Sequence, residues 1–216
     1  MIRVLVADDH AIVREGLKRI LGDESDLVLA GEATNGHEVL AAVRAGGFDI
    51  LLLDLSMPGK SGIELVKQVK EEQPRLKVLV LTMHEEDQYA VRAIRAGASG
   101  YLTKESASGQ LVSAIRRIAE GRMHISHNIA EQLALDAQSR SDEAPHKHLS
   151  DREFEVFNLL VAGRSISDIA AKLHLSVKTV STHKTRILQK MNAGSVAELV
   201  RYAIHHRLAG DPTPPP

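Results

Sequence analysis

The chain has 216 residues, of which 44% are hydrophobic and 25% are charged, and its formal net charge is −1 at pH 7. This composition excludes a disordered or fibrous protein and allows one large or two modest globular domains. Cysteine is absent, which excludes disulfides and cysteine zinc sites, and no apolar run is typical of a signal peptide or a membrane span. We therefore expect a cytoplasmic protein without membrane contact.

The first 121 residues alternate short apolar runs with segments of helical periodicity. Strands are expected at 3–7, 27–33, 50–54, 77–82 and 100–102. Amphipathic helices are expected at 11–21, 37–45, 62–72, 88–96 and 110–120. Strands that each lead into a helix form parallel βαβ units, in which helices cover both faces of the sheet. The pattern predicts an α/β domain over residues 1–121 with a doubly wound, five-stranded parallel sheet, as in flavodoxin-like folds.

The pattern changes after this domain. Residues 122–148 include one expected helix at 126–138 and a polar stretch with a proline, which we interpret as a linker. Residues 149–210 show only helical periodicity, and basic residues outnumber acidic ones there. Residues 211–216 are expected to be a disordered tail. A small basic all-α domain behind a mildly acidic α/β domain indicates a second task, such as binding nucleic acid.

Polar side chains follow the carboxyl ends of the predicted strands. They are Asp8 and Asp9 after the first strand, Asp54 at the third, Thr82 at the fourth and Lys104 after the fifth. In a parallel sheet these ends share one edge, so the side chains converge on one pocket. Three carboxylates in one pocket repel each other, and a divalent cation with oxygen ligands relieves that repulsion. Mg²⁺ suits this set, and the ammonium and hydroxyl groups remain available for an anion.

Each of these residues also has an ordinary interpretation. An isolated pair such as Asp8-Asp9 is more often a solvated turn, and an isolated Lys104 is more often a surface charge. His10 could tune the acidic pocket, but we expect it at a solvated helix N-terminus. The joint placement on one sheet edge favours the functional interpretation.

Four segments together resemble the receiver domain of two-component response regulators. They are ADDH, DLSMPGKSG, LTMHEE and GYLTKE, in the order and spacing of that family. The resemblance implies that Asp54 accepts a phosphoryl group from a sensor histidine kinase. It also implies that Asp9, Asp54 and the backbone carbonyl of Ser56 bind Mg²⁺, while Asp8 acts through a water molecule.

The same resemblance implies a conformational switch. Lys104 would pair with the phosphoryl group, Thr82 would move to bond it, and Tyr101 would change rotamer with the threonine. The face formed by the fourth helix and the fifth strand would then change shape and favour a homodimer.

The basic domain has clear helix-start signals. A capping box begins at Ser150, Ser165 or Ser167 caps a second helix, and Ser176 caps a third. Two helices across a tight turn predict a helix-turn-helix, and a last helix is expected at 195–206.

This domain resembles the LuxR-type output domain, which joined to a receiver gives the NarL/FixJ class. The resemblance rests on LSDRE, AGRSISDIAAKL, LSVKTVSTH and the last helix. It implies binding to double-stranded DNA with two-fold related half-sites. Ser181, Thr182 and Thr185 would face base edges, while Thr179 and His183 would touch phosphates. Many members of the family have lysine at the position of Ser181.

A helical projection divides the third helix of this domain into two faces. The apolar stripe, expected to face the core, consists of Val177, Val180, Ile187, Leu188 and Met191. The opposite face consists of Lys178, Thr182, Thr185 and Gln189. Lys184 falls within the apolar stripe, where its stem can pack while its ammonium reaches a phosphate. Further DNA contacts are expected from Lys178, Arg186 and Lys190.

These observations predict a DNA-binding transcriptional regulator that is switched by phosphorylation and is not an enzyme. One alternative is an Mg²⁺-dependent phosphohydrolase with Asp54 as covalent nucleophile. Such an enzyme needs a substrate-binding cap or specificity pocket, and this chain has a basic helical domain instead. A second alternative is a receiver that acts through protein contacts alone.

Overall fold

The computed structural model describes residues 1–57, 62–83, 87–138, 144–206 and 208. The chain forms two compact units, Met1–Leu133 and Ala134–Pro216, which are described separately. The division falls within α6 (His127–Gln138), the helix that the sequence predicts inside the linker. The predicted tail lies outside the described residues. Among the described helices, none combines the length and apolar character needed to cross a bilayer.

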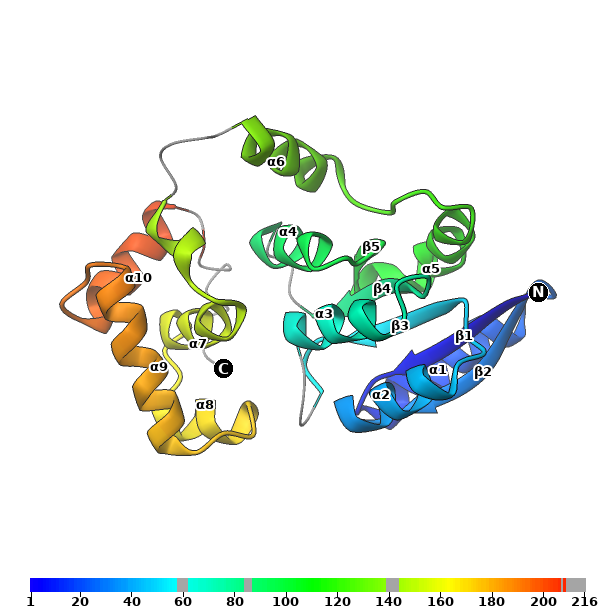
Figure 1. The fold of residues 1–216 in the computed structure, drawn as a ribbon, viewed down its shortest axis with the longest axis horizontal. Helices are drawn as coiled ribbons and strands as arrows, with labels where there is room; N and C mark the ends of the chain where they lie inside the picture. Colours follow the sequence, from blue (N-terminus) through cyan, green and yellow to red (C-terminus); the bar gives the residue numbers. More distant parts are fainter. Residues whose placement is uncertain (58–61, 84–86, 139–143, 207, 209–216) are drawn as a thin grey trace. The chain divides into compact units, whose positions relative to one another are not determined.

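The first unit contains a five-stranded parallel sheet in the order β2-β1-β3-β4-β5 (Figure 1). The strands are β1 (Ile2–Ala7), β2 (Leu27–Ala33), β3 (Ile50–Asp54), β4 (Lys77–Thr82) and β5 (Gly100–Thr103). The register pairs Asp54 with Leu81 and Thr82 with Thr103, so these strand ends lie at one edge. The predicted doubly wound parallel sheet is confirmed.

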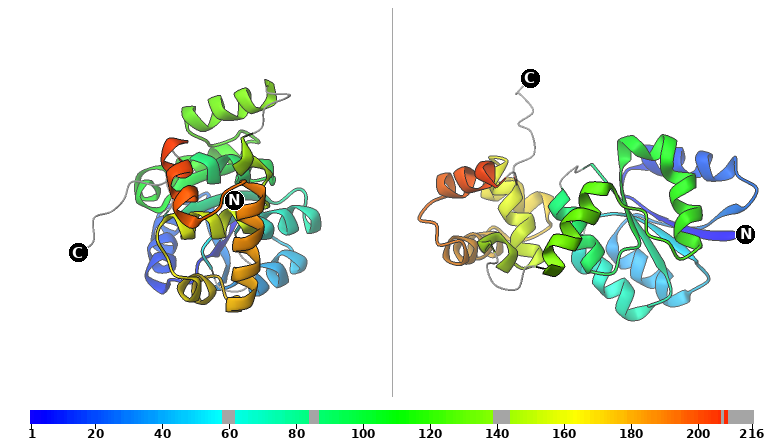
Figure 2. Two further views of the ribbon diagram at one scale, coloured as in Figure 1. Left: turned by 90° about the vertical axis from the view of Figure 1, so that its left-hand side faces the viewer. Right: turned by 90° about the horizontal axis from the view of Figure 1, so that it is seen from above.

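Helices cover both faces of this sheet (Figures 1 and 2). They are α1 (Ala11–Gly22), α2 (Gly36–Ala45), α3 (Gly62–Glu72), α4 (Asp87–Arg95) and α5 (Lys104–Ala119). α1 and α5 pack together on one face, and α2, α3 and α4 follow one another on the other. Aliphatic side chains of β1, β3 and β4 are buried along almost their whole length, as expected for strands covered on both faces.

The fifth helix begins at Lys104, earlier than the sequence pattern indicated. Ser106 and Gly109 are poor helix formers, which is why the periodicity was evident only from residue 110. Thr103 caps the helix by accepting a hydrogen bond from the Ser106 backbone N–H. Ala107 is buried against the sheet, so tertiary packing extends the helix through the weak segment.

The second unit is helical throughout its described residues. Its elements are η1 (Pro145–His148), α7 (Asp151–Val161), α8 (Ile166–Lys172), α9 (Val177–Lys190) and α10 (Val196–His205). Capping boxes begin α7 at Ser150 and α8 at Ser165, so Ser165 rather than Ser167 is the second cap. Ser176 caps α9, as predicted. His174 adopts a left-handed φ of 51° in the turn between α8 and α9, which makes the tight helix-turn-helix connection.

Candidate functional site

Lys104 joins two buried carboxylates at the carboxyl edge of the sheet. The side chains of Asp8 and Asp54 are each 1% exposed, and that of Asp9 is 31% exposed. The Lys104 Nζ atom lies 2.7 Å from Asp8 Oδ2 and 2.9 Å from Asp54 Oδ2. Because Lys104 is the first residue of α5, the cap at Thr103 fixes the point from which its side chain reaches the carboxylates.

Negative charge exceeds positive charge in this cluster. Burial raises the pKa of Asp54, and the negative charge of Asp8 adds to that effect, while the Lys104 ammonium opposes it. Burial acts to lower the pKa of Lys104, but hydrogen bonds to Asp8 and Asp54 raise it above its usual value. One ammonium therefore faces two buried carboxylates with Asp9 beside them. A divalent cation would supply the missing charge.

The backbone after β1 is held in place by its neighbours. The Asp8 N–H donates to the Ala33 carbonyl of β2 at 3.1 Å. The Arg14 guanidinium of α1 donates to the Asp8 carbonyl at 2.8 Å. Glu32 lies 3.5 Å from Arg14 and 2.9 Å from Lys18, which connects β2 to the same helix. These contacts fix the position of the acidic pair before any ligand binds.

His10 is part of the same cluster, although the sequence pattern favoured a solvated position over a role in the pocket. It occupies the N-cap position of α1 and its side chain is 64% exposed, as expected for a solvated helix N-terminus. Its Nδ1 atom nevertheless lies 2.9 Å from Asp9 Oδ1 and 3.2 Å from Asp8 Oδ1. The only signal in the sequence is that His10 directly follows the acidic pair.

Four side chains offer ligand atoms for one cation. One atom from each of Asp8, Asp9, His10 and Asp54 lies within 4.8 Å of the others. Two ligands on opposite sides of Mg²⁺ are about 4.2 Å apart, so small side-chain rotations bring this set around one ion. The oxygen-rich donor set and its excess negative charge fit a hard divalent cation.

The remaining predicted residues lie around this cluster. The Ser56 N–H donates to Asp54 Oδ1 at 3.1 Å, which places the Ser56 backbone beside the carboxylate. Thr82 is fully buried at the end of β4, and Tyr101 on β5 is 6% exposed. Tyr101 pairs with Val80, two residues before Thr82, so the threonine and the tyrosine are on the same face of adjacent strands.

Helix α9 shows the two predicted faces, with one correction. Val180, Ile187 and Met191 are buried and Leu188 is half-buried. Val177 was expected in the core, but it is 52% exposed. It occupies the first position of α9, directly after the cap, where the helix extends beyond the hydrophobic core. The opposite face, formed by Lys178, Thr182, Thr185 and Gln189, is exposed as predicted.

The hydroxyl groups on α9 bond to the backbone of their own helix. Ser181 donates to the Val177 carbonyl at 2.9 Å, Thr182 to that of Lys178 at 3.0 Å, and Thr185 to that of Ser181 at 3.1 Å. These oxygens remain able to accept hydrogen bonds, and the threonines also carry a methyl group. Thr179 lies against the cap, with its Oγ1 atom 2.8 Å from Ser176 Oγ.

The cationic candidates on this helix differ in their surroundings. Lys190 lies 2.6 Å from Glu153 Oε2 of α7 and 3.3 Å from the His148 carbonyl, so it joins α9 to α7 while 41% of its side chain remains exposed. Lys184 is half-buried, as its place in the apolar stripe indicated, and Arg186 is exposed. His183 is half-buried, and burial together with the Arg152 charge lowers its pKa, which favours a neutral imidazole.

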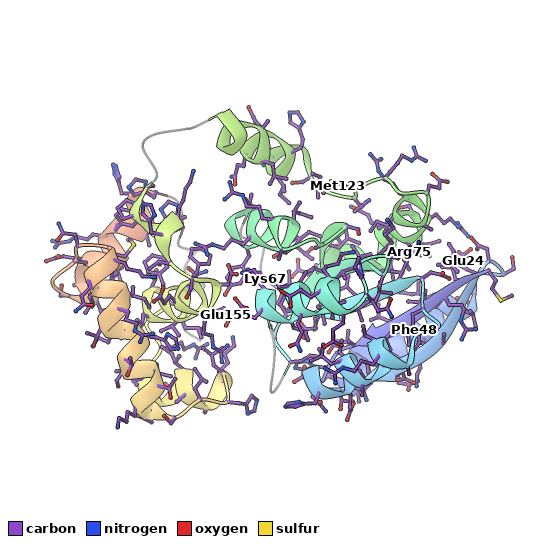
Figure 3. The ribbon with its side chains drawn as sticks, in the orientation of Figure 1. Glu24, Phe48, Lys67, Arg75, Met123 and Glu155 are labelled. Atoms are coloured by element: carbon purple, nitrogen blue, oxygen red, sulfur yellow. The ribbon has the colours of Figure 1, made fainter. Side chains whose placement is uncertain are left out.

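A cavity of about 490 Å³ lies in the first unit, away from these residues. Its lining includes Phe48 and Arg75, both labelled in Figure 3, and the first residues of β1 and β4. It is therefore at the amino edge of the sheet. The carboxylate cluster is at the opposite edge, where parallel α/β sheets place their ligand sites.

Comparison with known proteins identifies both parts of the chain. Residues 4–116 match the response regulator receiver domain, and residues 147–203 match the bacterial regulatory proteins of the luxR family. The chain is 36% identical to the response regulator UvrY of Escherichia coli O6:H1 over 214 residues, 99% of this chain and 98% of the relative. It is 40% identical to the response regulator GacA of Pseudomonas viridiflava over 207 residues, 95% of this chain and 97% of the relative.

Solved structures of the response regulator RcsB from Salmonella typhimurium are also similar. One covers 94% of this chain and 97% of its own, with 27% identity and a TM-score of 0.69. Another, bound to promoter P1flhDC in the presence of phosphomimetic BeF3−, covers 93% of this chain and 97% of its own, with 28% identity and a TM-score of 0.65. This chain therefore belongs to the NarL/FixJ class of response regulators, phosphorylation-regulated transcription factors in which a receiver domain precedes a LuxR-type helix-turn-helix domain.

Proposed function

We propose that Asp54 is the phosphoacceptor of this response regulator and that a sensor histidine kinase is the donor. The observation that supports this most strongly is the bridge of Lys104 between the buried Asp8 and Asp54 at the carboxyl edge of the sheet. A carboxylate held beside an ammonium and further carboxylates has the partners that phosphoryl transfer needs: a nucleophile, a counter-charge and a metal site.

The transfer would exchange one bond for another. An Asp54 oxygen attacks phosphorus, the P–N bond to the kinase imidazole breaks, and the imidazole leaves with a proton from the phosphohistidine or solvent. Lys104 already contacts Asp54 and would pair with the incoming phosphoryl oxygens. Thr82 would donate a hydrogen bond to the same group, and Tyr101 would follow its movement within the sheet face that they share.

Asp9, Asp54 and the Ser56 carbonyl would hold Mg²⁺, with Asp8 acting through a water molecule. Bound there, the cation would neutralise charge that develops on the phosphoryl oxygens. Asp8 supports this division of roles because one of its oxygens already contacts Lys104, whereas Asp9 is more open to solvent.

The output of the switch would be a homodimer on two-fold related DNA. A solved structure of RcsB supports this proposal, because in it the similar protein RcsB is bound to a promoter in the presence of a phosphomimetic. We assign residues 1–121 to the receiver, 122–148 to the linker and 149–210 to the DNA-binding domain, in a cytoplasmic protein. The base contacts would come from Ser181, which is half-buried, and from Thr182 and Thr185, which are exposed on α9.

Phosphorylation tests the central assignment. Incubation of the full chain with acetyl phosphate and Mg²⁺ should add one acid-labile phosphoryl group, visible by intact-mass spectrometry. Asp54→Asn should abolish the added mass, whereas the control Asp49→Asn, an exposed aspartate before β3, should retain it. A phosphoryl group that persists in Asp54→Asn contradicts the assignment. Sustained hydrolysis over many turnovers would instead indicate a phosphohydrolase.

A further inference from the structure

We propose that His10 is a nitrogen ligand of the receiver's divalent cation and that it increases the preference of the site for first-row transition ions over Mg²⁺. This inference rests on the proposed function, because it concerns the same metal site. It goes beyond that function by assigning to His10 a role in metal selectivity.

The position of the ring carries the inference. The Nδ1 atom of His10 lies 2.9 Å from Asp9 Oδ1, the carboxylate proposed as a direct ligand. It also lies 3.2 Å from Asp8 Oδ1. These distances put the nitrogen among the oxygens that would surround the cation, and His10 belongs to the set whose ligand atoms lie within 4.8 Å of one another.

The backbone holds His10 in place while its ring remains able to rotate. The His10 N–H donates to Asp8 Oδ1 at 2.8 Å, and Arg14 holds the Asp8 carbonyl. His10 is the N-cap residue of α1, but its side chain makes no capping hydrogen bond. Because the side chain is 64% exposed, a rotation from the carboxylate to an ion costs little packing.

A nitrogen ligand changes which ion the site prefers. Carboxylate, carbonyl and water oxygens suit Mg²⁺, whereas imidazole favours the later first-row transition ions. Mg²⁺ also keeps several of its waters and rarely exchanges them for a nitrogen ligand. With His10 in the coordination shell, we expect Ni²⁺ and Co²⁺ to gain most, Mn²⁺ to gain less and Mg²⁺ to gain least.

Pulsed electron paramagnetic resonance of bound Mn²⁺ tests the contact directly. The full-length protein is loaded with Mn²⁺ and its spectrum is examined for hyperfine coupling to ¹⁴N. We expect imidazole coupling in the wild-type protein, its loss in His10→Gln, and its retention in the control His37→Gln. His37 is an exposed histidine on α2, outside the cluster. Absent coupling in the wild-type protein, or coupling that persists in His10→Gln, overturns the inference.

Metal titrations provide a second readout. By calorimetry, His10→Gln should weaken Ni²⁺ and Co²⁺ binding by at least about tenfold, because even the loss of a group that only supports a metal ligand costs about ten- to a hundredfold. Mg²⁺ affinity should change little. Equal losses for all ions would overturn the claim of selectivity.

Two further variants distinguish an error in the proposed metal site from an error in the assignment of His10. Asp9→Asn and Asp54→Asn should each weaken Mn²⁺ binding. If neither variant does so, the ion binds elsewhere and the proposed metal site is wrong. If both weaken binding but the wild-type spectrum contains no nitrogen coupling, only the assignment of His10 is wrong.

Discussion

The acidic pocket and the recognition helix both present polar side chains, but these side chains are satisfied in opposite ways. In the pocket, Asp8 and Asp54 are almost completely buried and share Lys104, which comes from a distant part of the sequence. On α9, the hydroxyls of Thr182 and Thr185 are exposed and bond to carbonyls of their own helix.

This difference determines how strongly a change at each site should affect the stability of the fold. The pocket holds Asp54 in a position that disfavours its charge, as its raised pKa indicates. A cation or a change in charge there can therefore alter the stability of the whole receiver. The exposed face of α9 contains no buried charge, so substitutions of Thr182 or Thr185 should affect DNA binding and leave the fold intact.

The largest expected effect follows removal of the ammonium from the pocket. Lys104→Met leaves two buried carboxylates without their counter-charge, which should lower the free energy of unfolding by about 3–5 kcal/mol at neutral pH. Urea unfolding followed by circular dichroism measures this loss. The control Lys67→Met removes a partly exposed lysine of α3 and should change stability by less than about 1 kcal/mol.

The pH dependence of this loss identifies its cause. The folded-state pKa of Asp54 is raised, so the folded state binds a proton more readily than the unfolded state, and stability is lost as the pH rises through that pKa. Without Lys104 the shift should grow. The destabilisation should therefore be complete above the raised pKa and diminish as the pH falls through it. Adding Asp54→Asn to Lys104→Met should recover much of the loss, and a loss independent of pH would contradict this electrostatic explanation.

On helix α9, substitutions of residues that contact bases should differ in their effect from substitutions of residues that contact phosphates. Thr182→Ala and Thr185→Ala should change which operator variants bind, by about 1 kcal/mol, the lower end of the range for a base contact. Arg186→Ala should weaken binding to all sequences alike and lower the salt slope by roughly one unit. A DNA fragment that binds the phosphorylated protein is first selected, and variants of its sequence are prepared. Mobility-shift assays with these variants at several salt concentrations then measure the sequence preference and the salt slope. If the threonine variants weaken every site equally, the proposed reading face is wrong.

Lys190 sharpens the comparison, because it is on the recognition helix but is engaged within the fold. Lys190→Met should lower the free energy of unfolding by about 1 kcal/mol, since Glu153 loses its charged partner. Burial acts to raise the pKa of Glu153, but Lys190 and Ser150 hold it below its usual value. This stabilisation is therefore present above the ordinary glutamate pKa and disappears as the pH falls through the lowered one. Lys190→Met should leave the salt slope of DNA binding unchanged. A fall of the slope by about one unit would show instead that Lys190 contacts a phosphate, as the sequence analysis expected.

Much of this architecture could be predicted from local patterns. Nearly continuous apolar runs specify strands buried on both faces, and βαβ alternation specifies a parallel sheet whose carboxyl ends share an edge. That geometry brings Asp54 and Lys104 together without knowledge of any contact. The caps at Ser150 and Ser176 follow in the same way, because a side chain that bonds the first turn of its helix acts over a few residues.

Other features depended on tertiary structure. The fifth helix begins at Lys104 because Ala107 packs against the sheet, despite weak helix formers in that turn. Val177 is exposed because the core ends before the first turn of α9, which helical periodicity does not reveal. Lys190 pairs with Glu153 because a long side chain selects its partner by distance in the folded chain. Sequence periodicity determines which face of an element is apolar, whereas only the packed structure determines where that face ends and which charges lie within reach.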